Sequence, residues 1–177
     1  MKTKNITLNA LFLVVMAVLS QVVITLGPVP FNLGVLGAFL TGLMLTPKNA
    51  LMVMVGYIVL GFVGLPVFAG FSGGAGVLFG MTGGYIIGYI FISVISSAAC
   101  KASHSLDPRV RSIFTASMMF LSLIICYAFG TAWFMFITKN TLSTSLAVCV
   151  FPFIIPDLLK LISAVFLSKA LKKRLYM

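Results

Sequence analysis

Asp157 and Lys160, near the C-terminal end of the chain, are the residues whose types and spacing could bind a polar ligand in apolar surroundings. The sequence contains only two acidic residues. Asp107 lies in a polar loop, whereas Asp157 opens an apolar segment that runs to Leu167 and is interrupted only by Lys160 and Ser163. An ionisable side chain in hydrocarbon is costly, and it marks a functional site by default.

The local sequence predicts how this pair is held. Pro156 fits the first position of a helix, where a missing N–H costs nothing. Asp157 then lies in the first turn, where the helix dipole favours a negative charge. Lys160 is three residues further on, so both side chains lie on the same helix face. An ion pair that only neutralises itself is the alternative, but an apolar pair would fold at lower cost, so we interpret the pair as a polar patch that faces a pocket.

The composition is that of an integral membrane protein. The chain has 177 residues, of which 61% are hydrophobic and 8% are charged, and its mean hydropathy is +1.20. A soluble domain of this size has too little interior to hide so much apolar surface. We therefore predict a single transmembrane domain over residues 1–177, surrounded by the lipid bilayer. The net charge of +10 does not indicate a nucleic-acid interface, because the basic residues lie between apolar segments, as topology signals do.

The apolar segments predict an all-α fold with six transmembrane helices. Prolines between the hydrophobic runs end several of the segments. The predicted spans are Thr7–Leu26, Phe31–Leu45, Asn49–Val63, Gly80–Cys100, Val110–Thr138 and Pro156–Lys173. The second and third are short for a crossing of about 20 residues, so we expect them to extend into loops or to lie where the protein is thin.

The basic residues predict that both termini are cytoplasmic. Lysine and arginine are concentrated in the cytoplasmic loops of membrane proteins. With the N-terminus inside, all basic residues except Lys139 and Lys160 fall on the cytoplasmic side: Lys2, Lys4, Lys48, Lys101, Arg109, Arg111, Lys169, Lys172, Lys173 and Arg174. The start of the last span, with Asp157, is then expected near the outer face.

An uncharged, glycine-rich connection joins the third and fourth predicted spans on the outer side. Residues 64–79 read GLPVFAGFSGGAGVLF, which is too apolar for a freely solvated loop. We expect it to fold back over the helix ends, with glycines that allow positive φ or a close approach to a ligand. A phosphate-binding loop is not indicated, because no GK[ST] sequence follows. We predict that Gly70–Gly76, together with the Pro28–Pro30 turn, closes over bound ligand.

Small residues recur every four positions in two of the predicted spans. The second span carries Gly34, Ala38 and Gly42, and the fourth begins with Gly80, Gly84 and Gly88. Each set places a smooth strip on one helix face. Close packing within the chain is one interpretation, and a docking face for another membrane subunit is the other.

The sequence has none of the residue clusters typical of an enzyme or a metal site. The single histidine, His104, lies in a loop far from Asp157. Cys100, Cys126 and Cys149 lie in apolar sequence without metal-ligand spacing, which indicates buried thiols. One intramembrane acid is too few for a proton relay, and no filter motif or ring of charges indicates a channel. We predict a protein without enzymatic activity, metal or cofactor, which must take any energy from another chain.

Four blocks of sequence resemble the biotin-specific substrate-binding components of energy-coupling-factor transporters, the BioY family. These blocks are Gly27–Phe31 (GPVPF), Gly64–Leu78 (GLPVFAGFSGGAGVL), Thr82–Gly88 (TGGYIIG), and Pro152–Phe153 with Pro156–Lys160 (PDLLK). The resemblance runs from about residue 6 to the end of the chain. The long glycine-rich block followed by TGGY is highly specific for this family.

The resemblance implies a six-helix protein of the prokaryotic plasma membrane that captures biotin from outside. It also implies a partner complex of one transmembrane coupling subunit and two cytoplasmic ATPase subunits. Biotin would be the transported ligand and not a cofactor.

The sequence departs from the family pattern in two places. The family often reads PITLQ after the first loop, whereas residues 30–34 read PFNLG, with Asn32 as the polar side chain. The paired alanines expected on the first helix are not evident, since Ala10 and Ala17 lie seven residues apart. Docking to the coupling subunit is therefore expected to use Gly34, Ala38 and Gly42.

The chemistry of biotin agrees with the residues available. A buried carboxylate such as Asp157 is a strong acceptor for the two ureido N–H groups. Lys160 can donate either to the ureido oxygen or to the valerate carboxylate. Apolar and aromatic walls suit the ring sulfur and the alkyl chain. The further site residues that we expect are Phe31, Asn32, Phe71, Ser72, Gly73, Gly74 and Tyr85.

Two other functions are also considered. The same fold could bind another vitamin, such as riboflavin or thiamine, although a thiamine site is expected to carry more carboxylates or an aromatic cage for its cation. A non-transport scaffold subunit would bind no small molecule. Identification of the ligand that purifies with the protein separates these functions from biotin capture.

Overall fold

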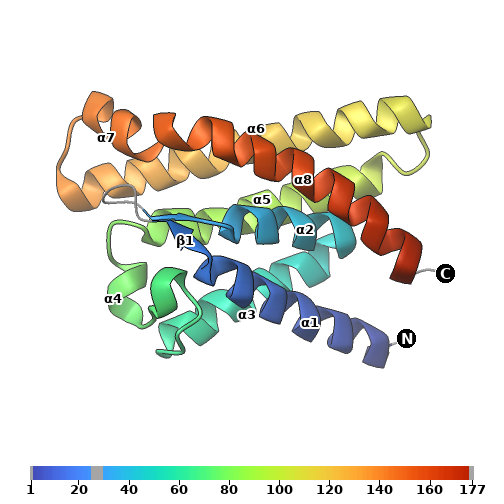
Figure 1. The fold of residues 1–177 in the computed structure, drawn as a ribbon, viewed down its shortest axis with the longest axis horizontal. Helices are drawn as coiled ribbons and strands as arrows, with labels where there is room; N and C mark the ends of the chain where they lie inside the picture. Colours follow the sequence, from blue (N-terminus) through green and yellow to red (C-terminus); the bar gives the residue numbers. More distant parts are fainter. Residues whose placement is uncertain (1, 25–29, 176–177) are drawn as a thin grey trace.

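The computed structural model describes residues 2–24 and 30–175, and most of this chain is helical. The six long helices are α1 (Lys2–Gln21), α2 (Gly34–Met44), α3 (Pro47–Phe62), α5 (Gly83–Ala102), α6 (Pro108–Thr138) and α8 (Phe151–Leu175). Figure 1 shows them as one elongated bundle, with α1 beginning and α8 ending at the same end of the molecule. The predicted all-α class is confirmed, and each predicted span overlaps one of these helices, although the bounds differ.

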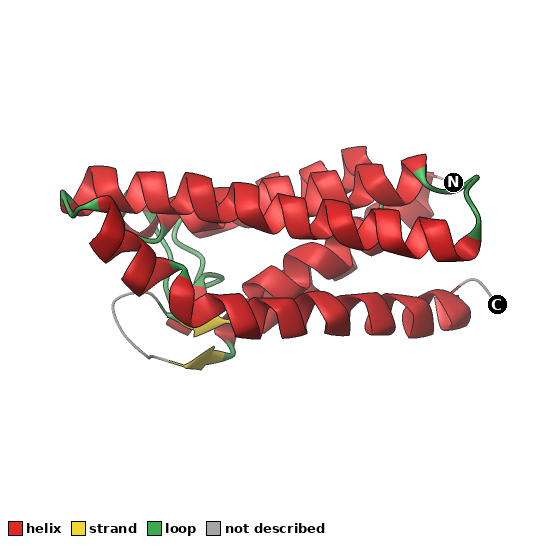
Figure 2. Cartoon of the chain, turned by 90° about the horizontal axis from the view of Figure 1, so that it is seen from above, coloured by secondary structure: helices red, strands yellow, loops and turns green. Residues whose placement is uncertain are grey.

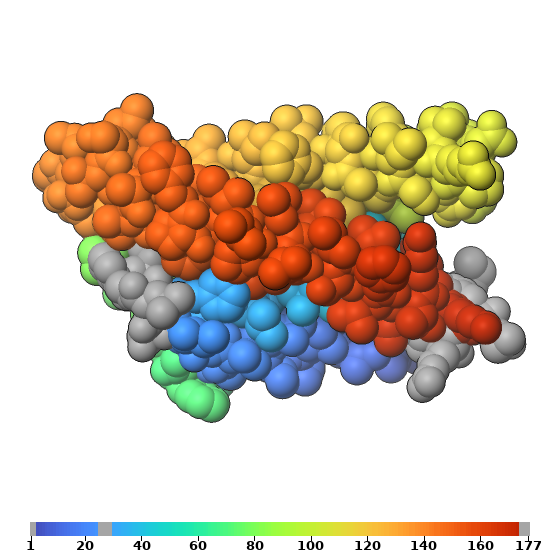
Figure 3. All heavy atoms as spheres, turned by 45° about the horizontal axis from the view of Figure 1, so that its top comes forward, coloured from blue at the N-terminus to red at the C-terminus, as the bar shows by residue number. Residues whose placement is uncertain are grey.

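The helices differ in their suitability to cross a membrane. Within the described residues, four segments are long and apolar enough: Thr3–Gln21, Gly83–Ala102, Pro108–Thr138 and Phe151–Lys173. The helices α2 and α3 have only 11 and 16 residues, as their short hydrophobic runs predict. Every residue of α2 is buried, and Figure 3 shows only small parts of it between α8 and α1. A helix that is surrounded by other helices can be short, because its ends do not have to reach the lipid headgroups.

Short elements gather mainly at the end of the bundle away from the termini (Figure 2), and two of them, the strands, replace the ends of the predicted helical spans Thr7–Leu26 and Phe31–Leu45. Two strands, β1 (Val23–Ile24) and β2 (Phe31–Asn32), pair antiparallel. The glycine-rich connection contains a 3-10 turn, η1 (Ala69–Phe71), and a short helix, α4 (Ala75–Leu78). The helix α7 (Leu142–Cys149) follows α6 and starts at an N-cap, where the Thr141 hydroxyl accepts the N–H of Thr144.

The last helix begins earlier than the sequence predicts. Pro156 was expected at the first helical position, but α8 starts at Phe151 and contains Pro156 in its interior. The first turn already forms upstream, where the backbone N–H groups of Phe153 and Ile154 donate to the carbonyl of Val150. Pro156 then removes only one helical hydrogen bond. The prediction that Asp157 lies in the first turn is therefore wrong, and the helix dipole is not what holds its charge.

The strip of small residues on α2 packs inside the chain. Gly34, Ala38 and Gly42 are all buried. A methyl group added to Gly42 would lie 2.5 Å from the backbone oxygen of Ser93 on α5. The strip thus lets α2 and α5 approach closely. The prediction that this strip docks a partner subunit is wrong, because α5 already covers the face.

The glycines of α5 serve the contact with α6 in the same way. A methyl group at Gly84 would collide with Trp133, and one at Gly88 would lie 2.6 Å from Sγ of Cys126. Gly80 precedes the helix, and its carbonyl accepts the indole N–H of Trp133 at 3.0 Å. The interpretation of both strips as packing within the chain is confirmed, and α5 lies at the centre of these contacts.

Candidate ligand-binding site

A cavity of about 180 Å³ lies in the half of the bundle that carries the short elements. Its wall comes from β2, α2, α3, the glycine-rich connection, α5, α6, α7 and α8. Five of the predicted site residues line it: Asn32, Ser72, Tyr85, Asp157 and Lys160. The fold thus brings together predicted residues that are widely separated in the sequence.

The pair on α8 forms the charged part of the wall. Nζ of Lys160 lies 2.6 Å from Oδ1 of Asp157, and the two residues are only 5% and 2% exposed. On the outward side of the same helix, Leu159 and Ile162 are exposed. Each buried charge depends on its partner, because removal of one would leave the other without compensation. The predicted polar patch on one helix face therefore exists, and it borders a cavity.

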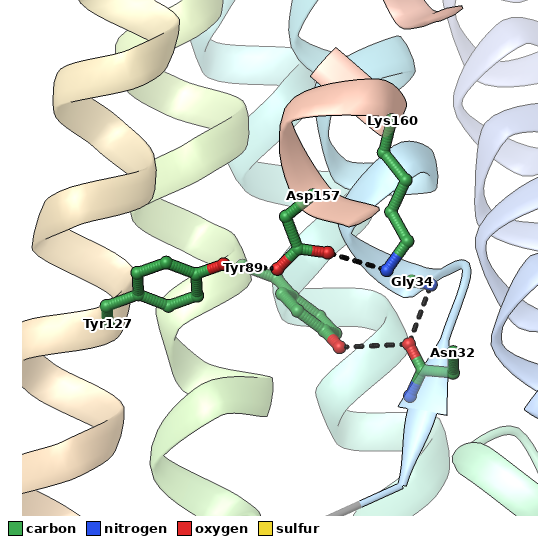
Figure 4. A network of polar contacts seen from close by, with 6 residues as sticks. All are labelled: Asn32, Gly34, Tyr89, Tyr127, Asp157 and Lys160. Carbon is green, nitrogen blue, oxygen red and sulfur yellow. Dashed lines mark hydrogen bonds and ion pairs between the residues drawn. The ribbon is translucent and has the colours of Figure 1, made fainter. Parts of the chain in front are cut away.

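A tyrosine holds the second oxygen of the carboxylate. The hydroxyl of Tyr127 on α6 donates to Oδ2 of Asp157 at 2.7 Å, while Lys160 donates to Oδ1 (Figure 4). An ionised carboxylate has about four lone-pair sites, so each oxygen keeps capacity for another donor. Tyr127 is not among the predicted site residues. The sequence could have indicated Tyr127, because it lies in a long apolar segment and a buried tyrosine hydroxyl usually has a hydrogen-bond partner.

Asn32 lies close to the pair and is oriented by its own bonds (Figure 4). Its Oδ1 accepts the backbone N–H of Gly34 at 2.8 Å and the hydroxyl of Tyr89 at 3.3 Å. A side chain at Gly34 would push into both Oδ1 of Asn32 and the Tyr89 hydroxyl. The glycine at the start of α2 is therefore what allows Asn32 to be fixed in the cavity wall.

Phe31 supports the lysine from behind the cavity wall. Nζ of Lys160 lies 3.8 Å from the centroid of the Phe31 ring, which is a favourable position for a cation–π contact. The Phe31 ring stacks on Phe153 with a centroid distance of 6.2 Å and an interplanar angle of 23°. Phe153 lines the cavity, and Phe31 does not. Phe31 therefore contacts the charged pair and is not in the wall itself.

Tyrosines dominate the rest of the wall. Four of the five tyrosines in the sequence line the cavity: Tyr57, Tyr85, Tyr89 and Tyr127. The hydroxyl of Tyr85 lies 2.9 Å from Oγ1 of Thr131, so the predicted Tyr85 is both a wall residue and a packing residue. Tyr89 lies one helical turn beyond Tyr85, on the same face, and this spacing could have identified it from the sequence.

The glycine-rich connection contributes four residues to the cavity wall: Phe68, Ala69, Ser72 and Val77. Ser72 lines the cavity and donates to the carbonyl of Ala69 at 2.8 Å. Phe71 is 72% exposed and is not part of the wall, and its N–H donates to Oε1 of Gln21 at 2.7 Å. The segment is also tied to α3, because the N–H of Gly74 donates to the carbonyl of Gly61 at 2.6 Å. The connection thus folds back onto the ends of α1 and α3.

Two predicted glycines of this segment shape the backbone without lining the cavity. A methyl group at Gly73 would collide with the carbonyl of Leu65, and Gly74 has a φ of +92°. Both positions therefore require glycine for reasons of space or conformation. In the other predicted part of the cover, Pro30 lines the cavity, whereas Pro28 lies outside the described residues.

The chain matches known proteins along nearly its whole length. The model of the BioY family matches residues 1–176. The "Probable biotin transporter BioY" of Pyrococcus horikoshii is 35% identical over 97% of this chain and 98% of that protein. The biotin transporter BioY of Thermotoga maritima is 35% identical over 92% of each chain.

A solved structure shares the fold. It is the crystal structure of the S-component for biotin from an ECF-type ABC transporter, with a TM-score of 0.85 and 28% sequence identity over 97% of this chain and 92% of that chain. The family match, the relatives and the shared fold agree with one another. The chain belongs to the BioY family.

Proposed function

We propose that this protein captures biotin at the outer face of the prokaryotic plasma membrane, as the substrate-binding component of an energy-coupling-factor transporter. The observation that carries the proposal is the buried Asp157–Lys160 pair at the wall of a cavity, in a chain of the BioY family. Its function would be binding and transport, not catalysis.

The pair is assigned to the ureido end of biotin. Asp157 accepts from the ureido N–H groups, since a carboxylate is a strong acceptor for them. Lys160 donates to the ureido oxygen, because its Nζ lies only 2.6 Å from the carboxylate and both groups therefore contact one end of a small ligand. Asn32, Ser72 and Tyr85 are further polar residues of the wall, and Phe31 holds the ammonium from behind.

Competition between biotin and its methyl ester tests this assignment. If Lys160 contacts the ureido end, the ester competes about as well as free biotin. If Lys160 instead holds the valerate carboxylate, the ester binds worse to the parent protein, and Lys160→Met largely removes that preference.

The glycine-rich connection is proposed as the cover of the site. Ser72 already lines the cavity, while the neighbouring Phe71 ring is exposed. Closure of Gly70–Gly76 over biotin would bring Phe71 toward the ligand, and Gly73 and Gly74 supply the backbone shape that this segment needs. Pro30, which lines the cavity, would complete the cover from the other side.

The proposed topology has six crossings and both termini in the cytoplasm. It is supported by the position of the two chain ends at the same end of the bundle, where the α5–α6 connection also lies (Figure 1). The basic residues Lys101, Arg109 and Lys169 belong to these segments and are exposed. This distribution follows the tendency of basic residues to remain in the cytoplasm.

One transmembrane coupling subunit and two cytoplasmic ATPase subunits are the proposed partners. Their support is the fold shared with the S-component of an ECF-type ABC transporter. The sequence carries no ATP-binding motif, so the energy for uptake would come from these partners.

Ligand identification tests the proposed function directly. The protein is purified in detergent, and small molecules that purify with it are identified by mass spectrometry. Calorimetric titration with biotin, riboflavin and thiamine follows on the ligand-free protein. We expect biotin to be identified and to bind. Recovery of another vitamin would support the first alternative function, and binding of none of the three would contradict capture of these vitamins altogether.

A further inference from the structure

An apolar groove separates α6 from α8 beside the cavity. It has a volume of about 550 Å³ and is lined by side chains of α6, α7 and α8, among them Leu123, Leu146, Ile154 and Leu158. Figure 1 shows α8 crossing the bundle and diverging from α6 toward the C-terminus. Along the groove, apolar side chains of the two helices therefore leave open space between them.

Tyr127 lies in the wall that the groove and the cavity share. Its hydroxyl reaches from α6 to Oδ2 of Asp157 on α8 at 2.7 Å (Figure 4). Hydrogen bonds to an ionised acceptor are about twice as strong as neutral ones. This bond thus joins two helices whose apolar side chains leave a groove between them.

The bond also restrains the carboxylate in a way that Lys160 cannot. The terminal torsion of an aspartate is broad, so its carboxylate rotates easily unless both oxygens are held. Lys160 lies on the same helix as Asp157 and holds only Oδ1. Tyr127 holds Oδ2 from another helix, and its ring has few rotatable bonds to order. Two donors on two oxygens fix the plane of the carboxylate and the directions of its remaining lone pairs.

We infer that Tyr127 is a positioning residue for ligand capture, which aims the free lone pairs of Asp157 at the N–H donors of the ligand. This inference rests on the proposed capture of biotin. It assigns to Tyr127 a role that acts through Asp157 and does not require contact between the phenol and biotin.

The test is biotin affinity in the full-length protein, measured by calorimetry after Tyr127→Phe. The phenylalanine keeps the ring in the groove wall and removes only the donor. We expect affinity to fall about three- to tenfold, as for the loss of one hydrogen bond. Ser122→Ala is the matched control, because it removes a buried hydroxyl on the same helix, whose one hydrogen bond within the described residues goes to the carbonyl of Met119. It should bind biotin like the parent.

A double-mutant cycle separates positioning from a general effect on packing. In the Asp157→Asn background the side chain has only one acceptor oxygen and no charge. The carboxylate that Tyr127 orients toward the ligand is then absent. Adding Tyr127→Phe there should change biotin affinity less than twofold. The inference is overturned if folded Tyr127→Phe binds like the parent, or if adding it costs as much affinity in the Asp157→Asn background as in the parent. Failure of the parent itself to bind biotin would instead contradict the proposed function.

Discussion

The two ends of the bundle hold their helices together in different ways. Toward the end with the termini, α2 and α5 are in close contact, because Gly42 leaves room for the backbone of Ser93, and Ser97 donates to the carbonyl of Leu45 at 2.5 Å. In the other half, a cavity lies between the helices, and tyrosines and the glycine-rich connection surround it. At the end with the termini, a small residue lets two helices pack in direct contact. At the other end, large side chains with polar tips surround a cavity.

The charged residues differ between the two ends as well. Lys101, Arg109 and Lys169, in the segments near the termini, are exposed. Asp157 and Lys160 are buried and bonded to each other. Exposed basic residues contribute little to packing and suit a role in topology. The buried pair suits ligand binding, because a hydrogen bond is electrostatically stronger in surroundings that exclude water.

The largest expected effect is a difference in labelling between the two ends of the bundle, which we expect to lie on opposite sides of the membrane. Cysteines are introduced singly at Lys139 and Lys101, in a background whose native cysteines are replaced by alanine. A membrane-impermeant thiol reagent added to intact cells should label the cysteine at position 139 and not the one at position 101. Labelling in the opposite pattern would reverse the orientation and place the cavity toward the cytoplasm.

The second effect concerns the charged part of the cavity wall. Asp157→Asn keeps the shape of the side chain but replaces a charged acceptor with a neutral amide. A hydrogen bond to a charged group is worth about 1.5–3 kcal/mol, so we expect biotin affinity to fall about ten- to a hundredfold. Calorimetric titration of the purified variant measures the change. Unchanged affinity after both Asp157→Asn and Lys160→Met would contradict the assignment of this site.

The third effect concerns the cover of the cavity, where two glycines offer a matched comparison. Gly73→Ala places a methyl group against the carbonyl of Leu65, whereas the same change at Gly76 meets open space. We expect biotin binding to weaken about tenfold for Gly73→Ala, which corresponds to roughly 1.4 kcal/mol, and to stay at the parent level for Gly76→Ala. Both variants should insert into the membrane. Equal binding by the two variants would show that the segment is only a connector.

The smallest effect on binding is expected from the tightly packed end. Gly42→Ala introduces a methyl group 2.5 Å from the backbone oxygen of Ser93, and such overpacking costs about 1–3 kcal/mol of stability. The melting temperature in detergent should fall, while the biotin affinity of the folded protein changes little. Gly56→Ala is the control, because its methyl group meets only the end of the Leu13 side chain. A large loss of affinity in Gly42→Ala would show that the two ends are coupled.

Much of the fold and part of the site could be predicted from the sequence. The apolar runs between prolines and glycines located all six long helices, since length and hydropathy are local properties. The spacing of Asp157 and Lys160 correctly placed both on one helix face. The predicted start of α8 was wrong, because a proline can stand in the first turn of a helix or inside one. The turn that forms upstream, at Val150, places Pro156 in the interior of α8.

The sequence by itself determined that this is a helical membrane protein with a charged pair on one face of an apolar helix. Hydrophobicity and helical spacing follow from residue types alone. Only the tertiary structure decided which helix covers which face. It placed α5 on the Gly34–Gly42 strip, left a groove between α6 and α8, and brought the Tyr127 hydroxyl to Asp157. These contacts join segments far apart in the chain, and they depend on how several helices pack at once, which no local pattern records.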